Sequence, residues 1–363
     1  MLDKSFFFPP NYQLRTTSYQ QSCIIPTMGG MAAAFLDGFT IKKPIEYGGL
    51  AVFPVCRVGD IPADEPETRT LAEGLKSGRV LVYETGRMEA VDVVNMDTAP
   101  ALIMDGETLV GGAQNRMLHT AAVVGPGERA EMPSSCVEVR RWDVPHSGEP
   151  HGGELPPEKA RFARSDFAFA SLRHQRMGEM ERSMRSDNRI AVDQQAVWAT
   201  IVRKFGVSGA KTDTLDLHEL YEEWDAALRA VTDRFHLVPG QTGMIVFLDR
   251  ETWFADIFFT RDLMQKQYKK ILKGIAFEAL IRLEAGIQVD AVRLPPSRRP
   301  ETEHARAALR GLRVARESPT PDGRGRFLSS PKCFGFAALV GGGVACLSAC
   351  SRKFWMGPAS KDI

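Results

Sequence analysis

Short segments in which apolar and polar residues alternate fill the chain from residue 35 to residue 142. A period of two is typical of strands with one buried face, and Gly-rich turns separate these segments. Closely spaced strands joined by such turns favour a mainly antiparallel sheet system, either a sandwich or an open barrel. The predicted strands are 48–56, 78–86, 88–96, 99–106 and two within 119–139 that meet at a Gly-Pro-Gly turn.

Apolar residues recur every three to four positions in much of the second half, which predicts amphipathic helices. The clearest is 217–235, with Thr214, or Asp213 before it, as the expected N-cap. Asp213, Asp216 and Glu219, with Glu222 and Glu223, are interpreted as favourable charges at its start and a solvated face. Two hairpins are also predicted, at 243–259 and at 327–351, the latter turning at three consecutive glycines. The other predicted helices are 71–78, 194–207 and 261–285.

These elements predict an α+β fold. Its N-terminal half is strand-rich and antiparallel, with amphipathic helices and C-terminal hairpins packed on it. We expect a single domain over 34–351, preceded by a poorly ordered extension (1–33) and followed by a tail (352–363). Within the domain we expect strand-rich 34–142, a loop at 143–165, helical and mixed 166–292, an Arg-rich insert at 293–326 with a basic helix at 303–317, and the hairpin 327–351.

Composition narrows the class of protein. The chain has 363 residues, with 46 basic and 45 acidic side chains, so it has no strong net charge to attract nucleic acid or an anionic membrane. It contains no apolar run of about 18 residues that would span a bilayer. Six scattered cysteines form no CxxC pair, which favours a reduced, cytoplasmic protein with neither a metal site nor a cofactor.

The stretch 104–120, MDGETLVGGAQNRMLHT, is the first candidate site, and we expect it to form an irregular loop. It holds the carboxylates of Asp105 and Glu107, and its Gly-Gly pair permits positive φ or close backbone approach. The amides of Gln114 and Asn115 and the guanidinium of Arg116 suit a phosphate, carboxylate or nucleoside ligand. The alternative is architectural: Arg116 pairs with Glu107, and the amides tie down the loop.

A second candidate lies at 134–142, SSCVEVRRW. Cys136 is a possible nucleophile if a base such as His119 lies nearby, although a Cys in a strand is more often part of a core. Glu138 and Arg141 offer polar contacts, and Trp142 offers a face on which a flat ligand stacks. The alternative for Trp142 is that it closes the end of the sheet.

The runs LIMDGETLVGGAQNRMLHTAAVV and PSSCVEVRRW together resemble the ARG and Rhodanese-Phosphatase-superfamily-associated domain family (ARPP type one), where ARG means ADP-ribosylglycohydrolase. The resemblance extends over residues 35–351 and implies a connection with NAD or ADP-ribose metabolism, without a mechanism. It carries over the motif positions Asp105, Glu107, Gln114, Asn115, Arg116, Cys136, Glu138, Arg141 and Trp142.

Three hypotheses follow. In the first, 104–120 and 134–142 form one pocket for a nucleotide- or ADP-ribose-like molecule, in which Arg116 and Arg141 bind anionic oxygens and Glu107 is the general acid or base of any reaction. In the second, the motif is architectural, and the Arg-rich insert or a sheet edge docks a protein partner. In the third, Cys136 carries out hydrolysis or group transfer.

Overall fold

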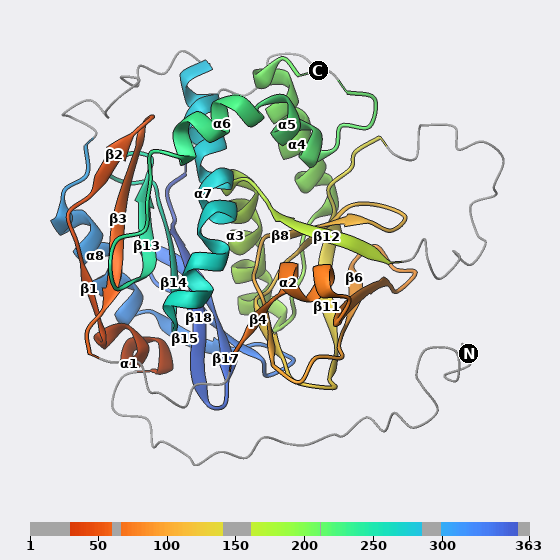
Figure 1. Ribbon diagram of the computed structural model, residues 1–363, viewed down its shortest axis with the longest axis horizontal. Helices are drawn as coiled ribbons and strands as arrows, with labels where there is room; N and C mark the ends of the chain where they lie inside the picture. Colours follow the sequence, from red (N-terminus) through yellow and green to blue (C-terminus); the bar gives the residue numbers. More distant parts are fainter. Residues whose placement is uncertain (1–29, 60–66, 141–160, 211, 285–298, 355–363) are drawn as a thin grey trace.

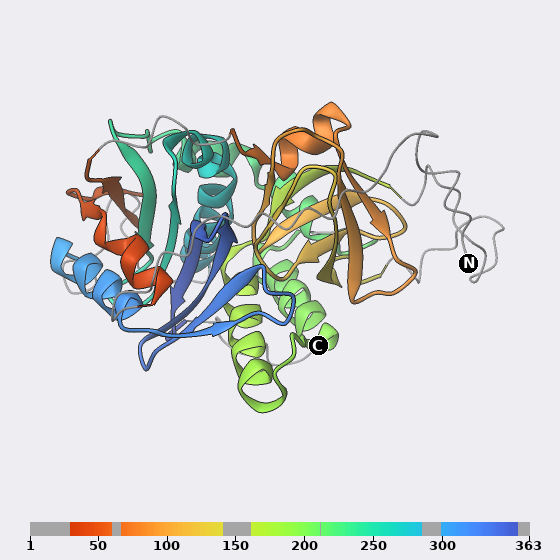
Figure 2. The ribbon, with the colours of Figure 1, turned by 90° about the horizontal axis from the view of Figure 1, so that it is seen from below.

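Two large antiparallel sheets lie side by side in the computed structural model, with helices between them and on the outer face of one (Figures 1 and 2). The structure describes residues 30–59, 67–140, 161–210, 212–284 and 299–354. The predicted α+β class and the antiparallel sheets of the N-terminal half are confirmed. Within the described ranges, no helix is long and apolar enough to cross a membrane.

The larger sheet has nine strands and combines the two ends of the chain. It runs in the order β1-β3-β13-β14-β18-β17-β16-β15, with β2 also paired to β3. The predicted hairpins at 243–259 and 327–351 are confirmed as β13–β14 and β17–β18. Its strands are β1 Phe39–Ile41, β2 Ile45–Tyr47, β3 Leu50–Arg57, β13 Gln241–Phe247, β14 Trp253–Phe258, β15 Arg316–Pro319, β16 Gly325–Ser329, β17 Cys333–Val340 and β18 Gly343–Ser351.

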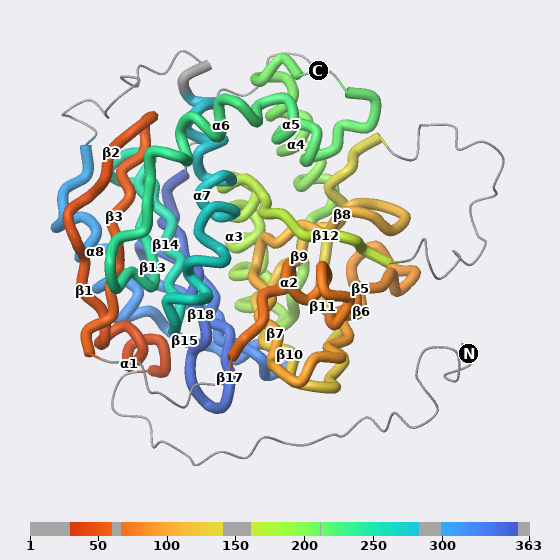
Figure 3. The backbone as a smooth tube through the Cα atoms, viewed as in Figure 1, coloured from red at the N-terminus to blue at the C-terminus, as the bar shows by residue number. Residues whose placement is uncertain are grey.

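The second sheet has six strands in the order β12-β8-β9-β11-β6-β5, and the backbone tube follows its curvature (Figure 3). A bridge between Tyr83 and Arg161 joins its two outer strands, so the sheet is a nearly closed barrel, one of the two predicted forms. Its strands are β5 Val80–Glu84, β6 Ala90–Asn95, β8 Glu107–Gly111, β9 Arg116–Leu118, β11 Arg129–Cys136 and β12 Phe162–Phe167.

A small third sheet, in the order β10-β7-β4, shares the apolar core of the barrel. Its strands are β4 Arg69–Thr70, β7 Ala101–Ile103 and β10 Ala122–Val124. The parallel pairing of β4 with β7 brings the start of the following helix, α2 (Leu71–Ser77), to the barrel. A capping box between Thr70 and Glu73 begins that helix, and Gly78 ends it at φ 68°, as predicted.

The remaining helices separate the two sheets or cover the outer face of the larger one. One core lies between the nine-stranded sheet and the helices that face the barrel, and a second lies on its opposite face, under α1 and α8 (Figure 2). The predicted helices 194–207 and 261–285 are confirmed as α4 and α7. The helices are α1 Met31–Asp37, α3 Ala170–Asp187, α4 Gln194–Ser208, α5 Leu217–Glu223, α6 Asp225–Thr232, α7 Arg261–Glu284 and α8 Thr302–Arg313.

Several predicted boundaries differ from the structure. The expected single helix 217–235 divides at Trp224, which leaves helical geometry (φ −99°, ψ 11°) while its ring packs against Phe277 of α7. Of the expected loop 143–165, residues up to 160 lie outside the described ranges, and β12 occupies its last residues from 162 onward. The insert 293–326 holds α8 and β15, so it contributes to the larger sheet. The helix α1 begins within the last residues of the predicted extension, whose residues 1–29 lie outside the described ranges.

Candidate functional site

The 104–120 stretch forms the hairpin β8–β9, which corrects the expectation of an irregular loop. Outside the two strands lie the connection 112–115, which holds Gln114 and Asn115, and the ends of the stretch at 104–106 and 119–120. Gly111 and Gly112 have φ of 111° and 68°, as the Gly-Gly pair allows. A Cβ on Gly111 would lie 3.3 Å from the backbone nitrogen of Ala163, so the glycine lets β12 approach closely.

Asn115 is the hydrogen-bonding centre of this hairpin. Its Oδ1 accepts from the backbone N–H of Gly111 (2.9 Å), and its own backbone N–H donates to Oε2 of Glu138 (2.8 Å). Its Nδ2 donates to Oδ2 of Asp216 (2.8 Å), at the start of α5. The structure therefore brings Asn115 and Glu138 together, as predicted, and links both to a helix about a hundred positions further along the chain.

The same network holds an imidazole that the sequence interpretation missed. His218 Nδ1 lies 3.1 Å from Oδ1 of Asp216, and Nε2 lies 2.9 Å from Oγ1 of Thr108 in β8. Asp216 is also the N-cap of α5, in a capping box with Glu219. The expected cap, Thr214 or Asp213, was therefore placed two or three residues too early, whereas Asp216 and Glu219 do lie at the helix start as predicted. All three members of this chain are buried. The sequence signal that could have identified this imidazole is the Asp-x-His spacing of residues 216–218 at the start of a predicted helix.

Glu107 lies on the same strand as Thr108 and is fully buried. Its Oε2 accepts from the backbone N–H of Met104 (3.0 Å), and its Oε1 accepts from Nζ of Lys270 on α7 (2.7 Å). Lys270 also donates to the hydroxyl of Ser165 on β12 (3.1 Å). The Glu107 carboxylate thus anchors α7 to the edge of the barrel.

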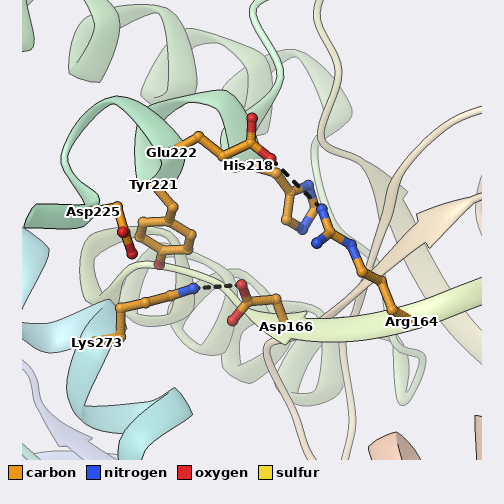
Figure 4. Close-up of a pocket in the computed structure, with 7 residues that line it drawn as sticks. All are labelled: Arg164, Asp166, His218, Tyr221, Glu222, Asp225 and Lys273. Carbon is orange, nitrogen blue, oxygen red and sulfur yellow. Dashed lines mark hydrogen bonds and ion pairs between the residues drawn. The ribbon is translucent and has the colours of Figure 1, made fainter. Parts of the chain in front are cut away.

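A pocket with a volume of about 330 Å³ opens where β12, α5, α6 and α7 meet. The imidazole of His218 forms part of its wall, and charged side chains from the other elements converge on the same space (Figure 4). The lining residues are Arg164, Asp166, His218, Tyr221, Glu222, Asp225 and Lys273.

The charges of this pocket are arranged as two cations beside three carboxylates. Lys273 Nζ lies 2.5 Å from Oδ2 of Asp166 and 4.4 Å from the centre of the Tyr221 ring, and Arg164 lies 3.8 Å from Glu222 (Figure 4). The Tyr221 hydroxyl is buried and has no hydrogen-bond partner among the described residues. Burial raises the pKa of Tyr221 well above its usual value, so the hydroxyl keeps its proton and remains a donor.

A comparison with protein families matches residues 38–350 to the model of the ARG and Rhodanese-Phosphatase-superfamily-associated Protein domain, ARPP-1. The chain belongs to the ARPP-1 family. This confirms the resemblance carried by the two motif runs. Comparisons with curated proteins and with solved structures found no match.

Arg116 of this ARPP-1 domain is part of the barrel wall. Its Nη2 lies 3.0 Å from Oε2 of Glu84, and Nη1 donates to the carbonyl of Met88 (3.2 Å). The exposed fractions of the two paired side chains are only 6% and 5%, and neither side chain lines the pocket. The architectural alternative named Glu107 as the partner, and the structure gives Glu84 instead. The neighbouring Gln114 is also buried, and its amide has no partner among the described residues.

Asp105 belongs to a buried charge cluster between the two large sheets. Arg173 of α3 lies 3.3 Å from Asp105 and 2.8 Å from Asp256 on β14, and Asp256 also accepts from the hydroxyl of Ser348 (2.8 Å). Burial alone would lower the pKa of Arg173, but the carboxylates of Asp256 and Asp105 more than offset it and raise that pKa. Asp105 therefore joins the barrel to the larger sheet and does not line the pocket.

Cys136 has the surroundings of a core cysteine. Its thiol donates to the carbonyl of Glu138 (3.2 Å), and burial raises its pKa to about 11, so it stays protonated at neutral pH. The side-chain amide of Gln194 accepts from the backbone N–H of Cys136 and donates to the backbone C=O of Cys136, each at 2.9 Å. His119 does not face the thiol, since its imidazole bonds to the hydroxyl of Ser135. These contacts give the thiol no activation.

Two predicted site residues, Arg141 and Trp142, lie outside the described residues. Of the other motif positions, Asn115 and Glu138 share one network, and Asn115 is joined through Asp216 to the pocket wall. Among the described residues, no group of three or more His, Cys, Asp or Glu side chains is arranged to hold a metal ion.

Proposed function

We propose that this ARPP-1 protein binds a small molecule that carries both anionic oxygens and hydroxyl groups, as nucleotides and ADP-ribose do, in the His218 pocket. The volume of about 330 Å³ is at the lower end of the roughly 300–1,000 Å³ typical of small-molecule sites. A sugar phosphate or a mononucleotide-sized portion of a larger ligand suits that space.

The mixture of charges supports this class of ligand. Lys273 and Arg164 are the cations available to phosphate oxygens, and the partly exposed ion pairs that they form are weak enough to be exchanged for a ligand. The carboxylates of Asp166, Glu222 and Asp225 accept hydrogen bonds from sugar hydroxyls. A ligand with phosphate alone would face three carboxylates without a donor to offer them.

One observation carries the proposal: a chain of hydrogen bonds leads from the 104–120 motif to the pocket. Asn115 holds Asp216, Asp216 holds His218, and His218 lines the cavity. Thr108 fixes the other ring nitrogen. In this proposal the motif residues position the wall, whereas the first hypothesis had them touch the ligand.

Isothermal titration with ribose 5-phosphate, AMP and ADP-ribose tests the proposal. The wild-type protein is expected to bind at least one of them. Lys273→Met and Arg164→Gln are each expected to weaken that binding about 10- to 100-fold, because a hydrogen bond to a charged group contributes about 1.5–3 kcal/mol.

Lys269→Met is the matched control. Lys269 lies on the same helix but pairs with Asp233, and neither of these residues lines the pocket, so the substitution is expected to leave the affinity unchanged. The proposal fails if none of the three molecules gives heat with the wild-type protein. It also fails if Lys273→Met and Lys269→Met have the same effect.

A docking role is the second candidate, and a groove of about 460 Å³ favours it. This groove lies between the end of α3 and the edge strand β15, and it carries the exposed cations Arg185 and Arg316. An acidic segment of a partner protein is the matching occupant. This role predicts no heat from the small molecules, and binding of an oligoglutamate peptide that Arg316→Glu abolishes.

A further inference from the structure

We propose, resting on the binding function above, that the His218 pocket hydrolyses phosphate esters and that His218 is the residue that transfers the proton. The inference goes beyond binding because the pocket holds an imidazole oriented by a carboxylate, which is the arrangement of a general base. The ligand of the His218 pocket is then a substrate that the protein hydrolyses.

The orientation of the imidazole comes from its two partners. The carboxylate of Asp216 at 3.1 Å favours the proton on Nδ1, which leaves the lone pair on Nε2. Asp216 is itself fixed by the Asn115 amide at 2.8 Å and by its capping position in α5. A carboxylate held in this way also stabilises the imidazolium that forms when Nε2 takes up a proton.

Thr108 is the resting partner of Nε2, at 2.9 Å, and completes a hydroxyl–imidazole–carboxylate chain. Its side chain is fully buried, so a substrate does not reach it as a nucleophile. In this proposal the imidazole, which forms part of the cavity wall, exchanges the Thr108 hydroxyl for a water from the cavity. Because that hydroxyl is neutral, the exchange separates no ion pair. The nucleophile in this proposal is therefore water.

The other pocket residues supply the electrostatic part of the reaction. Tyr221 is 4% exposed, its hydroxyl has no partner among the described residues, and it stands beside Lys273 in the cavity (Figure 4). A buried donor without an acceptor is costly unless a ligand supplies one. A phosphoryl oxygen between Tyr221 and Lys273 would accept a hydrogen bond from the hydroxyl and pair with the ammonium group. Arg164 adds a second cation where negative charge develops on the phosphoryl group.

The step balances as hydrolysis. Water loses a proton to Nε2 of His218 as its oxygen bonds to phosphorus, and the bond from phosphorus to the ester oxygen breaks. The departing oxygen takes the proton from His218. One ester and one water give one alcohol and one phosphate, and the imidazole returns to its starting state.

Release of 4-nitrophenol from 4-nitrophenyl phosphate and bis(4-nitrophenyl) phosphate measures the reaction. His218→Asn is expected to lower kcat about 100-fold or more, the usual contribution of general acid–base catalysis. His236→Asn, at an exposed position outside the pocket, is expected to leave kcat unchanged. Because His218→Asn disturbs a buried network, Tyr221→Phe is the second variant: it keeps the ring, and is expected to lower kcat about 10-fold with unchanged unfolding in urea.

Two outcomes overturn the inference. The first is a wild-type rate on both esters no higher than that of buffer. The second is Tyr221→Phe and His218→Asn proteins, each folded by circular dichroism, that keep the wild-type kcat. Titration with ribose 5-phosphate separates this failure from that of the binding proposal: heat without hydrolysis removes only the reaction, whereas the absence of heat from every ligand of the binding test removes the site itself.

Discussion

Replacing Arg116 with alanine is the sharpest test of how the motif works. Arg116 was a candidate for gripping an anionic ligand, but in the structure its guanidinium is sealed against Glu84 in the barrel wall. If that contact is its role, Arg116→Ala will cost stability and will leave the ligand affinity of the folded protein unchanged.

The size of the effect follows from burial. Both paired side chains are about nineteen-twentieths buried, and the 3.0 Å pair is supplemented by the bond from Arg116 to the carbonyl of Met88. Removing one partner of a buried pair leaves an uncompensated charge, which costs about 3–5 kcal/mol. Arg116→Met combined with Glu84→Gln leaves no buried charge, so it is expected to recover most of that loss.

Urea unfolding of the wild type, Arg116→Ala and the double variant measures these differences directly. Titration with the best ligand of the series follows, on Arg116→Ala protein that is still folded. The reasoning is refuted if Arg116→Ala loses ligand affinity while its free energy of unfolding stays within about 0.5 kcal/mol of the wild type, the usual range for a surface substitution. Arg116 would then belong to the ligand site.

Three further predictions test the surroundings. Gly106→Ala will destabilise by about 2 kcal/mol or more in urea, because φ is 82° and the new Cβ would lie 2.7 Å from Arg173; wild-type stability would contradict this. Burial lowers the pKa of His174 to about 4, so below about pH 6.5 the unfolded chain binds more protons than the folded protein and the free energy of unfolding decreases. In urea unfolding at pH 7 and at pH 4.5, His174→Gln will make this decrease smaller by about 2–3 kcal/mol. Iodoacetamide will leave Cys136 unmodified in the native protein by mass spectrometry, and rapid alkylation blocked by a ligand would instead support a catalytic thiol.

The helices and most strands were predictable because their hydrophobic periods are local. The helix α7 and the hairpin β17–β18 bury one face each against a core, and the residues that do so recur within a few positions of each other. The helix α3 was not located, because it buries Arg173 and Arg176, which interrupt any apolar stripe. For the same reason β8 was read as a loop: its buried positions include Glu107 and Thr108.

The candidate site was predictable only in part, because its contacts join distant positions. The motif identified Asn115 and Glu138, which do lie together. Their link to the pocket depends on Asp216 and His218, about a hundred residues further on, and no local pattern specifies that approach. The pairing of Arg116 with Glu84 was missed for the same reason, because it depends on the position of β5 in the barrel.

The most direct measurement of the central claim is the response of the His218 ring to ligand. The chain has seven histidines, and nitrogen-15 labelling of their rings gives resonances that single substitutions assign. Adding ADP-ribose or ribose 5-phosphate is expected to shift the Nε2 and Nδ1 signals of His218, while those of exposed His236 stay in place. Measurable binding heat without any change at His218 would contradict the account, because the ligand would then lie elsewhere on the protein.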